Sequence, residues 1–119
     1  MNHKQIRKLI KDTLERMNMW SAEAEELVFL TGMVESGYDY IYQIGSGIAR
    51  SFWQVESATA KDCIDNYLSY RKKKLNKACE VMHIEPERLL EMSDEDLKHL
   101  LWGNIVAGIE ICRIKYWRV

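Results

Sequence analysis

The sequence predicts a mainly α-helical fold with one irregular segment, and two observations support this prediction. Apolar residues recur at three- and four-residue steps through most of the chain, which is the period of an amphipathic helix. The exception is residues 38–56, where aromatic and β-branched side chains precede Gly45-Ser46-Gly47. Such a stretch predicts an irregular loop or a short hairpin, and we expect it to form one wall of a cleft beside a helical bundle.

The first two helices are expected at residues 3–18 and 22–36. The first has its apolar stripe at Ile6, Leu9, Ile10, Leu14 and Met17. Ser21 is the expected N-cap of the second, because its hydroxyl can accept hydrogen bonds from the free amides of the first turn. Glutamates follow it, and their negative charge suits the positive end of the helix dipole. Gly37 is expected in the turn that ends this helix.

A third helix is expected to start at Ser57 or Thr59 and to continue through Leu75. The end of this helix is rich in basic residues, which are Arg71, Lys72, Lys73, Lys74 and Lys77. Positive charge suits the negative end of a helix dipole. We therefore interpret the basic run as a solvated helix face rather than a phosphate or nucleic-acid site.

Two more helix starts are expected after residue 85. Pro86 favours the first turn of a short helix over residues 86–91. Ser93 and Asp96 have the spacing of a capping box and predict the start of a last helix, whose apolar stripe reaches Tyr116 and is interpreted as core. Gly103 and Gly108 fall inside this helix, where each would cost about 1 kcal/mol. We expect these glycines to allow close packing against a neighbouring helix.

Length, charge and cysteine usage exclude several classes of protein. A chain of 119 residues is expected to form a single domain, 1–119. Its net charge of −1 gives no support for nucleic-acid binding. Cys63, Cys79 and Cys112 form no CxxC pair and the histidines are isolated, so we expect buried free thiols and neither a metal site nor a cofactor. No apolar run approaches the ~20 residues of a membrane span, and the N-terminus lacks the apolar region of a signal peptide.

The irregular segment is the expected functional part of the chain. A structureless stretch of this length is uncommon in a compact domain unless it is functional. Glu35 ends the helix that precedes it and faces a polar, glycine-rich segment. Apolar and aromatic neighbours disfavour a carboxylate anion, so a carboxylic acid at this position is a candidate proton donor for glycan cleavage.

The motifs around this acid resemble a known family. Glu35-Ser36 is followed by Ser51-Phe52-Trp53-Gln54 and then by Ser57-Ala58-Thr59-Ala60, and nineteen positions separate Glu35 from Gln54. This pattern resembles the lysozyme-like lytic transglycosylases, although Ser51 replaces a glycine and Ser57 a proline of the family's pattern. The chain is most similar to small bacteriophage lysozyme-like proteins. The segments that carry this second similarity are Gln43 before Gly-Ser-Gly, Gln54-Val55-Glu56, and Ala107 with Arg113-Ile114-Lys115-Tyr116.

The resemblance covers residues 25–68 well and the last helix loosely. It implies an α+β lysozyme-like fold and cleavage of peptidoglycan between N-acetylmuramic acid and N-acetylglucosamine, with Glu35 as the acid and then the base. The residues expected to contact the substrate are Gln43, Gln54, Tyr38, Trp53 and Glu56. The amides would hydrogen-bond N-acetyl and hydroxyl groups, and the aromatic rings would offer flat faces to the sugars.

A hydrolase would also need a second carboxylate, for which Asp39 and Glu56 are the candidates. Asp39 is only four positions from Glu35, and capping of the following helix would be a sufficient reason for Glu56. We therefore favour the lytic route, in which one glutamate suffices and the product is a 1,6-anhydro sugar.

Two other functions stay open at this point. The chain could be a non-enzymatic phage structural or assembly protein that keeps a lysozyme-like helical frame. It could also be a small helical module that binds nucleic acid through its lysine-rich run. On the leading hypothesis, the partners are peptidoglycan glycan strands and phage virion proteins. The protein would be made in the cytoplasm and then be carried on a virion or released to the host cell wall.

Overall fold

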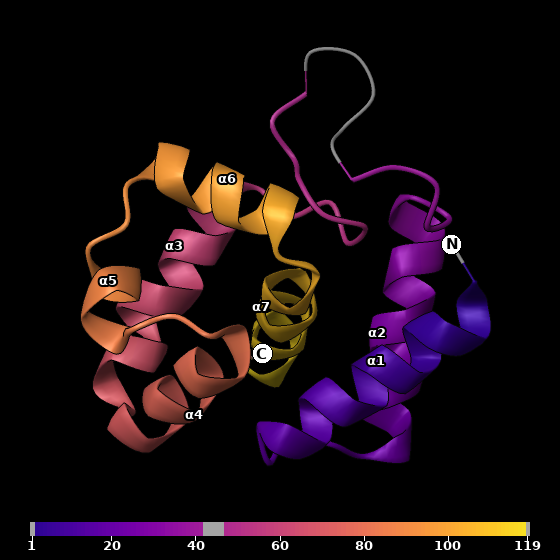
Figure 1. Ribbon diagram of the computed structural model, residues 1–119, viewed down its shortest axis with the longest axis horizontal. Helices are drawn as coiled ribbons and strands as arrows, with labels where there is room; N and C mark the ends of the chain where they lie inside the picture. The colour runs from indigo at the N-terminus through magenta and orange to yellow at the C-terminus, as the bar shows by residue number, and fades with distance from the viewer. Residues whose placement is uncertain (1, 42–46, 119) are drawn as a thin grey trace.

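The computed structural model describes residues 2–41 and 47–118, and these residues are mainly helical (Figure 1). The helices are α1 (His3–Arg16), α2 (Ala22–Glu35), α3 (Ser57–Asn66), α4 (Lys72–Met82), α5 (Pro86–Leu90), α6 (Asp94–Gly103) and α7 (Ile105–Trp117), with a 3₁₀ turn η1 (Leu68–Tyr70) between α3 and α4. In the described part of the chain the β structure is limited to an isolated antiparallel bridge between Arg50 and Val55. The prediction of a mainly helical fold is confirmed.

The predicted start and end of the second helix, α2, are both present. The hydroxyl of Ser21 accepts a hydrogen bond from the amide of Ala24 at 3.0 Å and so begins α2. Gly37 has a φ of +62°, a backbone conformation that glycine adopts without strain, and it turns the chain away from the end of α2. The end of α2 is therefore fixed at Glu35.

The predicted third helix is wrong, because it is two helices. The chain leaves α3 at Tyr67 and starts α4 at Lys72. Apolar residues continue at helical spacing across this break, so periodicity alone does not reveal it. As a consequence, Lys72, Lys73 and Lys74 lie in the first turn of α4, at the positive end of its dipole, and dipole compensation does not explain them.

The predicted last helix is also two helices, separated at Asn104. Its side-chain oxygen accepts a hydrogen bond from the amide of Ala107 at 3.2 Å, which caps the start of α7. Its side-chain amide donates to the carbonyl of Met82 at 3.2 Å and ties this corner to α4. The predicted capping box of Ser93 and Asp96 at the start of α6 is confirmed.

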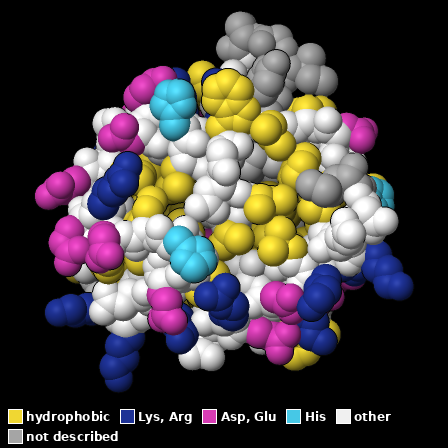
Figure 2. All heavy atoms as spheres, viewed as in Figure 1, with side chains coloured by type: hydrophobic (Ala, Val, Ile, Leu, Met, Phe, Trp, Pro, Cys, Tyr) yellow, Lys and Arg dark blue, Asp and Glu magenta, His cyan; other side chains and the backbone are white. Residues whose placement is uncertain are grey.

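Helix α7 lies in the middle of the molecule, with α1 and α2 on one side and α3 to α6 on the other (Figure 1). Figure 2 shows charged side chains around the rim of one face and hydrophobic side chains towards its centre. Gly108 of α7 is where the irregular segment packs, since a Cβ there would lie 2.8 Å from Ser51 Oγ and 2.9 Å from the ring of Trp53. The predicted close approach is thus made at Gly108, by a loop rather than by a helix, and the prediction is wrong for Gly103, where a Cβ would meet nothing within 4 Å.

The core contains one ionisable side chain that the sequence analysis missed. Glu110 of α7 has an exposed fraction of 0%. Neither carboxyl oxygen has a hydrogen-bond partner among the described residues. Burial raises the pKa of Glu110 to about 9, against a weaker effect of the Arg16 charge. The side chain is therefore uncharged at neutral pH.

Among the described residues, no helix has both the length and the apolar character needed to cross a membrane.

Candidate functional site

A small pocket lies where the end of α2, the turn at residues 51–56 and the last turns of α7 meet. The residues that line it are Thr31, Glu35, Trp53, Gln54, Val55, Glu56, Thr59, Ile111, Cys112, Lys115 and Tyr116. Its volume is about 120 Å³. The predicted site residues Glu35, Trp53, Gln54 and Glu56 are thus brought together, whereas Gln43 lies outside the described residues.

Glu35 is held at the end of α2 by a set of backbone contacts. The hydroxyl of Tyr40 donates a hydrogen bond to the carbonyl of Glu35 at 2.8 Å. The hydroxyl of Ser36 donates to the carbonyl of Gly32 at 3.2 Å and accepts from the amide of Tyr38 at 3.0 Å. The main chain is fixed on both sides of Glu35, while its side chain is exposed at the pocket.

The turn that carries Gln54 is tight and strained. Arg50 and Val55 exchange backbone hydrogen bonds of 2.9 and 2.7 Å across it. Between them, Ser51 and Gln54 have φ angles of +68° and +49°, which cost non-glycine residues on the order of 1 kcal/mol or more each. Such strain is often found at functional sites, where the surrounding structure holds it in place.

The side chain of Gln54 has a local partner. Its amide nitrogen donates to the carbonyl of Ser51 at 2.8 Å, which closes the turn. Its side-chain oxygen has no hydrogen-bond partner in residues 2–41 and 47–118. Gln54 can therefore still accept a hydrogen bond from a ligand, such as the N–H of an N-acetyl group.

The aromatic rings that we expected to stack on sugars lie in the core. The hydroxyl of Tyr38 donates to the carbonyl of Phe29 at 2.7 Å, and the indole nitrogen of Trp53 donates to the carbonyl of Val28 at 2.8 Å. Their exposed fractions are 1% and 3%. Gly32 makes room for this packing, because a Cβ there would lie 2.2 Å from the Tyr38 hydroxyl. Both rings fasten the loop to α2, and neither has an open face for a sugar.

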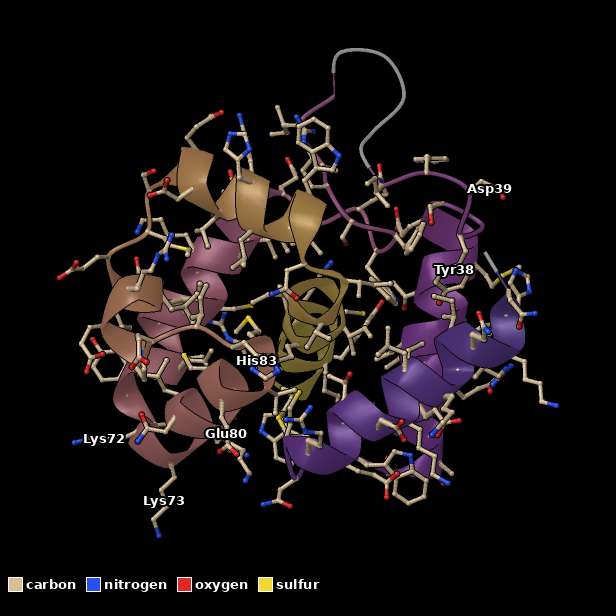
Figure 3. All side chains as sticks on the ribbon, in the orientation of Figure 1. Tyr38, Asp39, Lys72, Lys73, Glu80 and His83 are labelled. Carbon is tan, nitrogen blue, oxygen red and sulfur yellow. The ribbon has the colours of Figure 1, made fainter. Side chains whose placement is uncertain are left out.

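The two candidates for a second carboxylate are in different places. Asp39 is exposed and points away from the body of the molecule, next to the buried Tyr38 (Figure 3). Glu56 lines the pocket with Glu35. Glu56 occupies the N-cap position of α3 but makes no capping hydrogen bond through its side chain. Capping therefore does not explain a glutamate at this position.

Three polar residues of the pocket were not among the predicted site residues: Thr31, Lys115 and Tyr116. Thr31 Oγ1 lies 2.7 Å from the carbonyl of Leu27, to which it donates its only proton. The hydroxyl of Tyr116, 3.1 Å away, must then donate to Thr31. This bond fixes the ring of Tyr116, which is 37% exposed, at the edge of the pocket.

The pocket is smaller than the 300–1,000 Å³ that is usual for sites that enclose a ligand, so it has room for one group of a larger substrate that lies across its mouth. A larger hollow of about 470 Å³ lies between α5 and α6, remote from Glu35 in the chain. The residues that line it are Ile84, Arg88, Glu91, Met92, Asp96, His99 and Leu100. Its charged side chains are mostly exposed, and no predicted site residue lies there.

The thiols and carboxylates of the described residues are not grouped as the ligands of a metal ion. Cys63, Cys79 and Cys112 are buried and free, and each lies on a different helix. Burial raises the pKa of Cys79 to about 11 and that of Cys112 to about 12, so both are thiols at neutral pH. In the described ranges, no three His, Cys, Asp or Glu side chains are grouped closely enough to hold a metal ion.

Comparisons with known proteins identify no relative of this chain. No family model, no curated protein and no solved structure matches it. A functional conclusion therefore depends on the residues that the pocket brings together.

Proposed function

We propose that this protein is a peptidoglycan-cleaving glycosidase of lysozyme-like fold, in which Glu35 is the catalytic acid. One observation carries the proposal. Glu35 ends α2, whereas Gln54 and Glu56 lie in the turn before α3, yet all three line the same pocket. Glu35 and Gln54 have the nineteen-position spacing that resembles the lytic transglycosylase pattern.

Cleavage of the bond between N-acetylmuramic acid and N-acetylglucosamine needs a proton on the leaving oxygen. The carboxyl group of Glu35 would supply this proton as the bond to the muramic acid C1 breaks. In the lytic route the substrate's own 6-hydroxyl then attacks C1 and gives its proton back to Glu35, which leaves a 1,6-anhydro sugar. Gln54 would accept a hydrogen bond from the N-acetyl group and so orient the sugar at this step.

A hydrolytic outcome is the second candidate, and the position of Glu56 favours it. A carboxylate that shares the pocket and caps no helix is available to activate water or to stabilise the positive charge at C1. In this route water adds at C1 and the product has a free reducing end. Asp39, which points away from the body of the molecule, has no part in either route (Figure 3).

In this proposal the protein is encoded by a phage and acts on glycan strands from a virion or after release to the host wall. The other reading is a virion structural protein that keeps a lysozyme-like helical frame without cleaving glycans. The pocket volume of about 120 Å³ is small for an enzyme site, and this observation favours the structural protein as the second candidate.

Digestion of purified peptidoglycan followed by mass spectrometry of the sugars tests the proposal. We expect anhydro-muropeptides from the wild type and none from Glu35→Gln. Reducing-end products that disappear in both Glu35→Gln and Glu56→Gln would assign the hydrolytic route. Asp39→Asn is the matched control, because it removes an exposed carboxylate outside the pocket and should leave cleavage unchanged. A folded wild type that releases no sugar fragments would refute the enzyme and favour the structural protein.

A further inference from the structure

Positive charge on this chain is concentrated on one surface, which we call the basic face. Its residues are Arg71, Lys72, Lys73, Lys74, Lys77, Arg113, Lys115 and Arg118. Residues 67–79 and 111–119 contain these eight of the 17 Lys and Arg and none of the 18 Asp and Glu. The net charge of −1 is therefore the sum of a basic region and an acidic remainder.

Contacts between cations and aromatic rings join the two segments into one surface. The ring of Trp117, in the last turn of α7, lies 4.7 Å from Lys74 Nζ and 4.9 Å from the guanidinium of Arg113. The ring of Tyr67 lies 3.9 Å from the guanidinium of Arg71 and 6.0 Å from that of Arg118. The start of α4 and the end of α7 thus lie side by side.

The lysines at the start of α4 do not stabilise the helix that carries them. They occupy its first turn, where the dipole is positive, and this turn has no acidic residue and no side-chain cap. Figure 3 shows Lys72 and Lys73 pointing away from α4 into solvent. In the described part of the chain, no carboxylate forms an ion pair with Lys72, Lys73 or Lys74. Stabilisation of the fold therefore does not explain why these positive charges are concentrated here.

The basic face is continuous with the pocket of Glu35. Lys115 lines that pocket and also lines a neighbouring hollow of about 330 Å³ together with Arg118. Arg118 is held in place by Asp62 at 2.7 Å. From Arg118 the surface continues across Tyr67 to Arg71 and the start of α4. A long anionic polymer bound along this path would pass the mouth of the pocket.

We propose that the basic face binds the anionic polymer of the cell wall, through the carboxylates of peptidoglycan stem peptides, and presents the glycan strand to the Glu35 pocket. This proposal rests on the proposed function. Exposed ammonium groups attract such a polymer over distances of about a Debye length, roughly 10 Å at 0.1 M salt. We favour a wall polymer over nucleic acid because the basic face leads through Lys115 into the pocket that is proposed to cleave the glycan strand. Tyr70, beside Arg71, has an exposed ring on which a base could stack, so single-stranded nucleic acid is the alternative that the test must distinguish.

Co-sedimentation with purified peptidoglycan sacculi tests this inference. The charge-reversed variant Lys72→Glu/Lys73→Glu should lose about tenfold or more of the binding at about 50 mM salt, and wild-type binding should fall steeply towards about 300 mM salt. Lys4→Glu/Lys11→Glu on α1 is the matched control, with the same change in net charge on another surface, and should bind as the wild type does. Lys72→Gln/Lys73→Gln repeats the test without introducing new negative charges.

Glu35→Gln separates this inference from the proposed function. It should bind sacculi as the wild type does and release no sugar fragments. Binding that depends on the basic face without any cleavage by the wild type would refute the enzyme and keep the docking surface. Equal binding by wild type and both Lys72/Lys73 variants would overturn the inference. So would a wild type that binds a fluorescent nucleic acid strand but itself stays in the supernatant when sacculi are sedimented, which would assign the basic face to nucleic acid.

Discussion

The buried carboxyl group of Glu110 should control how the stability of the protein depends on pH. It lies in the middle of α7 with no exposed surface, and neither of its oxygens has a hydrogen-bond partner in the part of the chain that the structure describes. Burial raises its pKa from 4.5 to about 9. The side chain is therefore protonated in the folded protein over a range in which the unfolded chain has already lost its proton.

The sign and size of the effect follow from this difference. Below about pH 4.5 the group is protonated in both states, and its contribution to the free energy of unfolding is constant. Between pH 4.5 and about 9, folding must take up a proton, so the free energy of unfolding falls by about 1.4 kcal/mol per pH unit. At pH 7 the accumulated loss is about 3 kcal/mol, a large part of the 5–15 kcal/mol that is typical of a domain.

Urea denaturation of the wild type and Glu110→Gln at a series of pH values measures this effect. The glutamine has the shape of the protonated acid and does not ionise, so the variant should lack this pH dependence. Between about pH 5 and pH 8 the stability of the variant relative to the wild type should increase by about 4 kcal/mol. The neighbouring Cys79 thiol, with a pKa of about 11, stays protonated over this range, so it should not hide the effect.

The control is Glu15→Gln on α1, which removes an exposed carboxylate and should change stability by no more than about 0.5 kcal/mol at any of these pH values. Parallel pH profiles for wild type and Glu110→Gln would show that Glu110 is ionised in the folded protein. That result would refute the burial argument. Glu110→Met, which is apolar and of similar length, repeats the comparison without the buried amide of glutamine.

Three further substitutions test the packing that holds the pocket in place, each by urea denaturation. Gly108→Ala should destabilise the protein by about 1–3 kcal/mol, because the new Cβ would lie 2.8 Å from Ser51 Oγ, whereas Gly103→Ala meets no atom within 4 Å and should be neutral or stabilising. Tyr38→Phe should cost about 1 kcal/mol through the lost bond to Phe29, and an unchanged stability would contradict a closed contact there. Asn104→Ala should cost about 1–2 kcal/mol by removing the cap of α7, and Asn104→Asp, which keeps the capping oxygen, should recover part of that loss.

The helices could be predicted from local signals, and the breaks between them could not. Caps such as Ser21 and Ser93 act within one turn, so the residues that form them are adjacent in the sequence. The breaks at Tyr67 and Asn104 have a different cause, since apolar residues keep their helical spacing across both. Asn104 interrupts the helix because its side chain accepts a hydrogen bond from the first turn of α7 and donates one to the carbonyl of Met82. The contact with Met82 joins distant parts of the chain and cannot be predicted from the sequence.

Part of the candidate site could likewise be predicted from the sequence, and part of it could not. Glu35, Gln54 and Glu56 could be named from the sequence because their spacing resembles a known pattern. The sequence, however, does not distinguish an aromatic residue in a loop that faces a sugar from one that packs into the core. The burial of Tyr38 requires the space that Gly32, six residues earlier, leaves for its hydroxyl.

The pocket's second wall comes from Lys115 and Tyr116, eighty residues after Glu35 in the chain, and only the packing of α7 against α2 brings them there. Their place next to Glu35 has a consequence for the chemistry. A lysine at the mouth of the pocket favours anionic groups on the strand that crosses it, while the Tyr116 hydroxyl, whose proton is used on Thr31, is left able to accept hydrogen bonds but not to donate a second one. If the proposed function holds, the wall formed by α7 should therefore select the orientation of the glycan strand, and Glu35 should act on the bond that this orientation brings to it.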